Sequence, residues 1–359
     1  MPISVTGTTD TNGAISVQTG TTKIACVVAR KGTGVPSMET NKVFSVTGTA
    51  DAGIKWGEGS KAVQLVSALI NNGVTLIKGI LVQEVDITYT TLDDTYALAF
   101  AKLLAEDIDV IVLDDVASII LTELKAHLDT AEEEDKFRYA VVGSDGDDTA
   151  LIALAASMNH KRIFVVGPTV TNISGVVLSN IYSSAGLAAL ICTETADPAL
   201  PMNSVEMKGF GSVSRITLKS EKTALVNGGV VPLYTSASGY PTIYRLVTSY
   251  TEDALSQPDP VWQEGTTVFI ADDVLRSVQT RIKQNYKRTK NVARILDAIR
   301  TDVVSVLQTK NDLEIIQDFD PKTVSVLKDP TDSFGALIDY DFKVVTPLYN
   351  ITISQHMKL

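Results

Sequence analysis

The sequence contains few of the residues that enzymes use in metal or thiol chemistry. Its 359 residues include three histidines and two cysteines. None of the histidines (His127, His160 and His356) belongs to an HExxH motif or has another metal-ligand spacing. Cys26 and Cys192 each lie in an apolar run and not in a CxxC pair. A metal site or a disulfide framework is therefore not expected, and both thiols should be buried.

The usual nucleotide and hydrolase motifs are also missing. The phosphate-loop pattern GxxxxGK[ST] is absent, no GxGxxG follows the first apolar run KIACVVAR, and no GxSxG is present. No cofactor and no enzymatic activity are therefore expected. One alternative stays open, because Asp114 and Asp115 end an apparent strand. A metal-dependent hydrolase on a doubly wound sheet would hold Mg²⁺ there, whereas the competing interpretation is a solvated acidic rim.

Long hydrophobic runs are lacking as well. No apolar run approaches the ~18 residues that a membrane span needs. The start, MPISVTGTTD, has no basic stretch followed by an apolar one, so no signal peptide is expected. We expect a protein that is made in the cytoplasm, stays there until something else moves it, and does not insert into a membrane.

Basic residues are scarce overall and unevenly placed. The formal net charge is −11, which makes nucleic acid a poor first partner. Residues 84–148 hold 18 acidic against 4 basic residues, and residues 276–300 hold 8 basic residues against one acidic. The basic stretch predicts a helix whose partner is an acidic protein surface, with a plain solvated face as the alternative. Its candidate contact residues are Arg276, Arg281, Lys283, Lys287 and Arg288.

What the sequence does contain is an alternation of short apolar runs and amphipathic segments. Strands are predicted at 23–30, 74–82, 108–114, 137–143 and 162–167, and helices at 59–73, 95–106, 118–134 and 149–158. A helix-to-strand passage at 182–194 is expected to close this unit near residue 195. Strands and helices at βαβ spacing predict an α/β domain over residues 23–200, with a mostly parallel sheet.

The pattern of predicted strands and helices changes after the turn-rich segment ADPALPMNS. Strands are predicted near VSRITLK, GGVVPLY and YPTIYRLVTSY, followed by two amphipathic helices. Near the end, Ile338, Tyr340, Phe342 and Val344 alternate with polar residues, as in a strand with one buried face. Strands, then helices, then strands favour a second domain, of α+β type, over residues 201–346.

The two ends read as strand-like arms. Residues 1–22 are rich in Thr, Gly and Ser, and too little apolar surface is present to hold this arm to its own domain. Pro347 separates a second arm, residues 347–359, from the strand before it. The arms offer alternating apolar residues to a neighbour's sheet: Ile3, Val5, Ile15 and Val17 in the first, and Tyr349, Ile351 and Ile353 in the second.

In this order, these segments resemble the contractile tail sheath family. The likeness rests on KIACVVAR, the turn KGTGVPS, the pair Trp56-Gly57, and LINNGVTLIKGILV. It continues through the small-residue helix and loop YSSAGLAALICTETADPALPMNSVEMKGF, then ALVNGGVVPLYTSASGYPTIYRLVTSYT, and the end ALIDYDFKVVTPLYNITISQHMKL. Two departures from the family are the missing Gly-Pro pair in the first turn and Trp in place of Phe at position 56.

The resemblance implies a structural subunit of a helical homopolymer. Sheath subunits stack as hexameric rings around an inner tube, exchange terminal strands with neighbours, and contract without ATP to drive the tube through a target cell envelope. Baseplate and tail-terminator proteins are further implied partners. The resemblance places 23–200 outside and 201–346 against the tube. The five basic contact residues are therefore expected to face the tube or, as the alternative, the acidic stretch 84–148 of a neighbouring subunit. The short chain is similar to the compact sheaths of R-type, diffocin-like bacteriocins and simple myophages, which assemble in the cytoplasm of the producing bacterium and leave by lysis.

Overall fold

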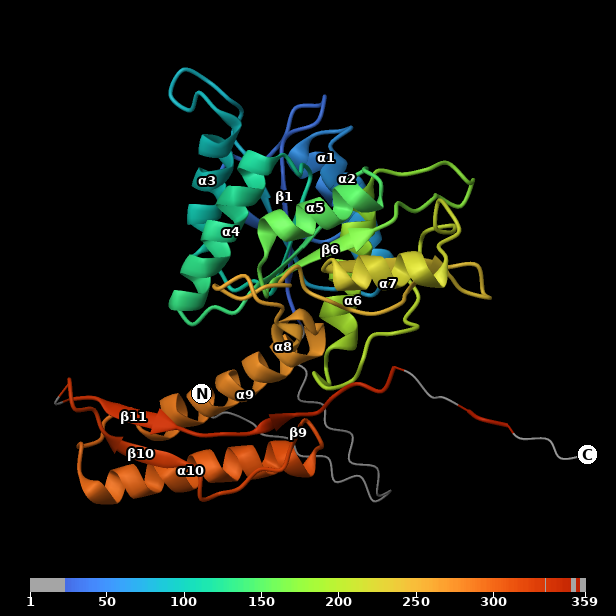
Figure 1. Ribbon diagram of the computed structural model, residues 1–359. Coiled ribbons are helices and arrows are strands. Elements are labelled where there is room, and N and C mark those ends of the chain that lie inside the picture. The colour runs from blue at the N-terminus through green and yellow to red at the C-terminus, as the bar shows by residue number, and fades with distance from the viewer. Residues whose placement is uncertain (1–22, 333, 350–352, 356–359) are drawn as a thin grey trace, which may run out of the picture.

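The computed structural model describes residues 23–332, 334–349 and 353–355 (Figure 1). The N-terminal arm residues Ile3, Val5, Ile15 and Val17 lie outside the described residues, as does Ile351. No described helix combines the length and the apolar character that a bilayer span needs.

A mixed, mostly parallel sheet of eight strands forms the larger part of the molecule, which confirms the predicted sheet type. Its strand order is β2-β3-β1-β4-β5-β6-β7-β8, and only the two edge strands β2 and β8 run antiparallel to their neighbours. The strands are β1 Ala25–Ala29, β2 Val43–Val46, β3 Ile77–Leu81, β4 Val110–Leu113, β5 Tyr139–Val142, β6 Ile163–Gly167, β7 Val230–Thr235 and β8 Pro241–Ile243.

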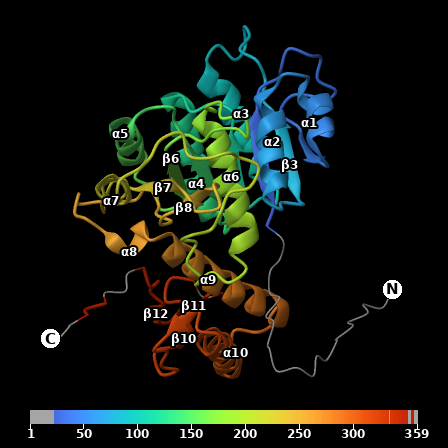
Figure 2. The ribbon, with the colours of Figure 1, turned by 90° about the vertical axis from the view of Figure 1, so that its right-hand side faces the viewer.

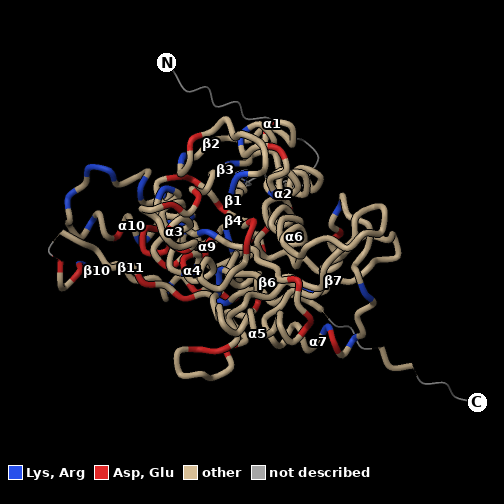
Figure 3. The backbone as a smooth tube through the Cα atoms, turned by 90° about the horizontal axis from the view of Figure 1, so that it is seen from above, with Lys and Arg blue, Asp and Glu red and all other residues tan. Residues whose placement is uncertain are grey.

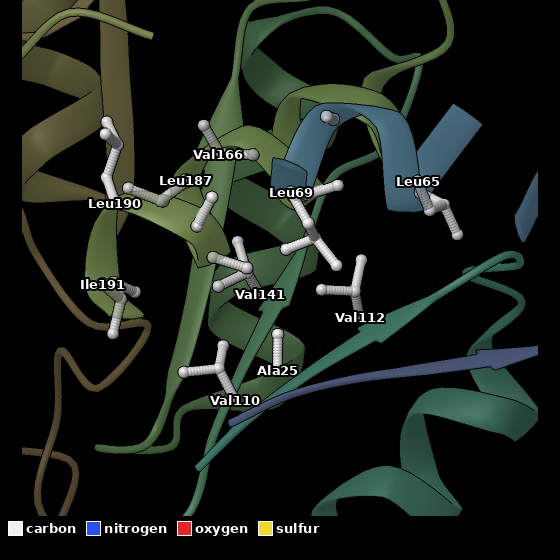
Figure 4. Close-up of a cluster of buried hydrophobic side chains, with 14 of the residues drawn as sticks. Ala25, Leu65, Leu69, Val110, Val112, Val141, Val166, Leu187, Leu190 and Ile191 are labelled. Atoms are coloured by element: carbon white, nitrogen blue, oxygen red, sulfur yellow. The ribbon is translucent and has the colours of Figure 1, made fainter. Parts of the chain in front are cut away.

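Helices cover both faces of this sheet, which is why its central strands are continuous apolar runs. On one face lie α1 Thr49–Trp56, α2 Lys61–Asn71 and α6 Asn180–Glu194. On the other lie α3 Leu92–Leu103, α4 Ser118–Glu133, α5 Asp148–Met158 and α7 Lys219–Asn227. Figure 4 shows the first of the two cores, in which Leu69 and Leu187 meet strand residues such as Val112 and Val141.

Two local predictions for this region are wrong. Residues 182–194 were expected to pass from helix to strand, but they belong to the single helix α6, which is buried along most of its length. An apolar run buried on all sides does not show the period that tells a helix from a strand. The segment VSRITLK is not a strand either, because only Val213 forms an isolated bridge, to Val170, before α7 begins.

The predicted border at residue 200 does not coincide with the end of the sheet. Strands β7 and β8 lie beyond it and extend the same sheet, because β7 pairs in parallel with β6. The remaining elements are α8 Pro260–Gln263, α9 Gly265–Asn285, α10 Ala293–Asp312, β9 Ile316–Gln317, β10 Ser325–Lys328, β11 Ala336–Asp339 and β12 Lys343–Val344. Antiparallel pairs β10–β11 and β9–β12 pack with α9 and α10 in a third core.

The alternation near the chain's end is confirmed, although it serves two small sheets and not one. Ile338 lies in β11 and Val344 in β12, and the chain between them leaves strand geometry. All four apolar residues, with Tyr340 and Phe342 between, pack on the third core. A two-residue period therefore identified the buried face but not the change of partner strand.

Helix α9 belongs to two cores at once. Near its N-terminus, Val268 and Phe269 pack in the core of the large sheet. About one and a half and two and a half turns further on, Val274 and Val278 pack with α10 in the third core. Figures 1 and 2 both show α9 between the sheet and α10, so this one helix joins the two parts of the chain.

Candidate functional site

A group of mutually bonded polar and charged residues lies where α9 meets the sheet. Asp272 of α9 and Arg162, at the start of β6, form a bidentate ion pair, with Arg162 Nη2 2.9 Å from Asp272 Oδ1. Both side chains are less than a tenth exposed. The hydroxyl of Tyr139 donates a third hydrogen bond to Asp272, at 2.5 Å. We call Arg162, Asp272, Tyr139 and Glu132 the joint.

Glu132 completes the joint from the end of α4. Its carboxylate accepts from Arg162 Nε at 3.0 Å and from Lys161 Nζ at 2.7 Å. Burial opposes the charge, but the hydrogen bonds from these two cations lower the pKa of Glu132 to about 2. Burial likewise opposes the charge of Arg162, yet its hydrogen bonds to Asp272 raise its pKa further. Each charged side chain of the joint thus has a partner of opposite charge within it.

Two more ion pairs tie α9 to its surroundings. Arg276 Nη1 lies 3.2 Å from Asp109 Oδ1 before β4, and its Nη2 donates to the carbonyl of Phe137. Lys310 of α10 lies 2.5 Å from Asp273, which precedes Arg276 by one turn. The helix is thus fixed to the sheet and to α10 by separate polar contacts, in addition to its two apolar faces.

Lys23, the first described residue, also ends at this joint. Its ammonium lies 5.8 Å and 5.2 Å from the ring centroids of Tyr139 and Phe269 and donates to the hydroxyl of Thr195. Burial lowers the pKa of Lys23, although nearby Asp109 opposes the shift. Lys23 therefore lies in the groove beside α9.

The five basic residues predicted as contacts do not form one surface. The basic stretch 276–300 is not a single helix, since α9 ends at Asn285 and α10 begins at Ala293. Arg276 belongs to the joint region, and Lys283 pairs loosely with Asp135 at 3.8 Å. Arg281 is 2.9 Å from Asp302 of α10, which also accepts from Asn285 and Tyr286, so it secures the turn between the helices.

Lys287 and Arg288 of that set are available to a partner. Both are exposed, and neither forms an ion pair with any described residue. They lie in the α9–α10 turn, which also carries the exposed Lys290. Figure 3 shows this run of basic residues on a loop at the rim of the molecule. We call residues 287–290 the basic turn.

The C-terminal candidates separate in a similar way. The Tyr349 hydroxyl donates to Glu264, the residue before α9, at 2.5 Å, and its ring lies 4.6 Å from the guanidinium of Arg245. Arg245 in turn pairs with Glu264 at 2.7 Å. Tyr349 thus contacts its own subunit, whereas Ile353 is 86% exposed.

The carboxylates of the hydrolase alternative are already engaged. Asp114 is buried, accepts from the Tyr96 hydroxyl and from the Arg30 backbone N–H, and lies beside the Arg30 guanidinium. Asp115 pairs with the same guanidinium at 2.6 Å. Among the described residues no group of three metal-ligating side chains is present. This arrangement joins the ends of β1 and β4 and gives the two aspartates a structural role.

Two descriptions of one family match consecutive parts of the sequence. "Phage tail sheath protein central domain" matches residues 90–249, and "Phage tail sheath C-terminal domain" matches residues 257–358. The chain belongs to the contractile tail sheath family. The sequence matches no curated protein.

Solved sheath structures share the fold of this family member over nearly its whole length. The helical sheath of the anti-feeding prophage in its contracted state has a TM-score of 0.72 at 14% identity, covering 99% of each chain. The sheath tail protein of Listeria innocua has a TM-score of 0.69 at 12% identity, covering 91% of this chain and 93% of its own. That of Desulfitobacterium hafniense has a TM-score of 0.67 at 12% identity, covering 96% and 100%.

In this sheath-family chain, no sequence motif identifies the joint. Neither Arg162 nor Asp272 was singled out, although each interrupts an otherwise apolar pattern: Arg162 precedes the buried run IFVVG, and Asp272 lies on the buried face of α9. A charge on a buried face predicts a buried partner of opposite sign. The sequence contains many acids, however, and it does not tell which of them is that partner.

The lowered pKa of Glu132 predicts that this sheath protein becomes less stable at acid pH. The folded-state pKa of Glu132, about 2, is below its usual value of 4.5. The charge of Glu132 therefore stabilises the fold fully above pH 4.5, and this stabilisation is lost as the pH falls toward 2. Glu132→Gln should therefore lower the free energy of unfolding near neutral pH, and the gap from wild type should close between about pH 4.5 and pH 2. Urea unfolding across this range measures it, and a gap that is independent of pH would contradict it.

Proposed function

We propose that this chain is the subunit of a contractile sheath that polymerises as stacked hexameric rings around an inner tube. Contraction of the polymer, without ATP, drives the tube through the envelope of a target cell. The observation that carries the proposal is the match of both sheath domains, over residues 90–249 and 257–358. The full-length likeness to a sheath solved in a contracted helical state supports it.

The interior of the molecule suits a part that works by packing and not by chemistry. Its conspicuous buried charges, in the joint and around Asp114, bond to one another and fix elements in place. In a metastable polymer the free energy for movement is stored in contacts between subunits and is released when they repack. Such a subunit needs rigidity, defined surfaces and exchangeable ends.

Further partners follow from the same proposal. The inner tube, a baseplate and a tail terminator would bound the polymer, and the anti-feeding prophage baseplate is itself among the similar solved assemblies. We place assembly in the cytoplasm of the producing bacterium and release at lysis, as part of a phage or of a phage-tail-like particle such as an R-type, diffocin-like bacteriocin.

Electron microscopy of the purified protein tests this function. A sheath subunit at high concentration should form long hollow tubes with a helical repeat, whereas an enzyme should form discrete oligomers. Only discrete particles, at every concentration and salt condition and in the presence of the tube protein, would contradict the proposal.

The terminal arms are proposed to exchange between subunits by strand addition. On the C-terminal side, Tyr349 bonds to Glu264 of its own chain and Ile353 is exposed. The exchanged stretch would therefore begin after Tyr349. The family resemblance assigns Ile351 and Ile353 to the neighbour's sheet, together with Ile3, Val5, Ile15 and Val17 of the N-terminal arm.

The basic turn is proposed to contact the inner tube. Reversing Lys287 and Arg288 to Glu should weaken sheath–tube association, because these exposed cations have no competing partner in the described chain. Exposed pairs contribute only about 0.2–1 kcal/mol each, but they repeat in every subunit. Cosedimentation of sheath with tube at low salt measures the loss.

The matched control reverses Lys322 and Lys328, two exposed lysines of the same part of the molecule that form no ion pair with a described residue. Equal loss in both double variants would mean that net charge matters and the basic turn does not. Arg281 is left unchanged, because its reversal would break the contact with Asp302.

A further inference from the structure

A cavity of about 850 Å³ lies between α7, strands β7 and β8, and Tyr349. Its walls are basic and aromatic, and none of the described residues that line it is acidic. The residues that matter for its chemistry are Lys219, Lys222, Tyr234, Tyr244, Arg245 and Tyr349. The family match assigns no role to it.

Lys222 is the best positioned cation of this cavity. Its Nζ lies 5.0 Å from the ring centroid of Tyr234 and 4.8 Å from that of Tyr244, so the ammonium is placed by two rings. Rings do not satisfy N–H donors as a carboxylate does, and the Lys222 side chain has no hydrogen bond or ion pair within the described chain. Its donors are therefore free for a ligand.

The other two cations of the cavity, Arg245 and Lys219, differ in whether an acidic side chain already neutralises them. Arg245 is paired with Glu264, so its charge is compensated. Lys219 is exposed at the start of α7, one turn before Lys222, and has no ion pair with a described residue. The cavity thus carries an excess of two positive charges from Lys219 and Lys222. A concave site with two uncompensated ammonium groups and several hydroxyls suits a carboxylate.

This chain itself supplies exposed carboxylates at a distant place. Glu133 and Glu134, at the end of α4, are exposed and form no ion pair with a described residue. Along the helical layer the contacts run from α3 to α4, α5 and α7, so α4 and α7 are not neighbours (Figure 1). Two different complementary surfaces on one subunit make a head-to-tail contact that propagates a polymer.

We propose that this cavity is a carboxylate-binding site, and that in the assembled sheath it receives Glu133 and Glu134 of a second copy. The identity of the occupant rests on the proposed function of self-assembly. The ability of the cavity to bind carboxylates does not, and the two are tested separately.

The first experiment uses the unassembled protein and a fluorescent peptide with the sequence of residues 126–137. The peptide should bind in a salt-dependent manner, and Lys222→Met should weaken binding by about ten-fold, since a charged hydrogen-bond partner is lost while the aliphatic stem stays over the rings. Lys208→Met is the matched control, because Lys208 is exposed, has no ion pair with a described residue and lies outside the cavity. No binding, or equal weakening in both variants, would overturn the site.

The second experiment exchanges the charges within the polymer. Lys219→Glu with Lys222→Glu should prevent tube formation, and so should Glu133→Lys with Glu134→Lys. A chain that carries all four changes should recover tubes, since the contact is restored with reversed sign. Two results would overturn the assignment of Glu133 and Glu134 as the occupant. One is normal tubes from the variant with Lys219→Glu and Lys222→Glu, and the other is no recovery of tubes in the fourfold variant. If wild type formed no tubes at all, the proposed function would fail, and the peptide experiment would still decide whether the cavity is a site.

Discussion

Replacing Asp272 by Asn is expected to lower the free energy of unfolding by about 3–5 kcal/mol. The substitution keeps the shape of the side chain and removes its charge. Arg162, whose side chain is 3% exposed, would then keep a buried guanidinium with Glu132 as its remaining carboxylate. A buried charge that loses its partner is costly because water cannot replace the partner. The effect should be among the largest of any single substitution in this chain.

Denaturant unfolding at low protein concentration measures this effect on the unassembled subunit. Asp318→Asn is the matched control, since Asp318 forms an ion pair with Lys343 in which both side chains are about two-thirds exposed. Asp318→Asn should lower the free energy of unfolding by no more than about 1 kcal/mol. Should the Asp272 variant fail to fold, Tyr139→Phe removes a single hydrogen bond to Asp272 and should lower the free energy by roughly 1–3 kcal/mol. Losses no greater than that of the control would show that the joint is not a stabilising element.

Deleting residues 2–20 is expected to abolish tube formation and leave the melting temperature of the subunit almost unchanged. The buried cores of the described chain begin at Ala25, and the last anchor before them is Lys23, which the deletion keeps. The loss of tubes follows from the proposed exchange of the N-terminal arm between subunits. Calorimetry of the dilute protein and electron microscopy of the concentrated protein measure the two halves of the prediction.

A scrambled arm of the same composition is the control for chain length and solubility. If the scrambled arm supports tubes as well as the natural arm does, assembly does not require the alternating apolar residues, which are Ile3, Val5, Ile15 and Val17. Normal tubes from the deleted chain would refute strand exchange at this end, and a large fall in melting temperature would assign the arm to its own subunit's core.

Much of the fold could be predicted because its signals are local. The strands β1, β4, β5 and β6 are apolar runs between helices of clear amphipathic period, and burial on both faces leaves no other place for them than the middle of a parallel sheet. Helix α6 could not be recognised in the same way. Small residues such as Gly186, which lies against Met207 and Phe210, let neighbouring segments pack closely on it, so it is buried along most of its length and its period is lost.

The candidate site could be predicted only in part, because charge is visible in a sequence and pairing is not. Arg276, Lys287 and Arg288 look alike in the basic stretch, yet Arg276 bonds to Asp109, which lies 167 positions away. The exposed turn keeps Lys287 and Arg288 free of such partners in the described chain. Long-range pairing of this kind depends on the whole fold, and no local pattern specifies it.

Because α9 packs in two cores, cleavage of the chain before this helix should not separate the two parts of the molecule. The two family matches meet between residues 249 and 257, which suggests a division just before α8. A protease that cut there would break the chain in the loop before α8. Helix α9, about 31 Å long, would still hold Phe269 in the core of the large sheet and Val278 in the third core. The nicked halves should therefore stay together through gel filtration under native conditions and part only in denaturant. A subunit built in this way can be cleaved in its loops without ceasing to be one body.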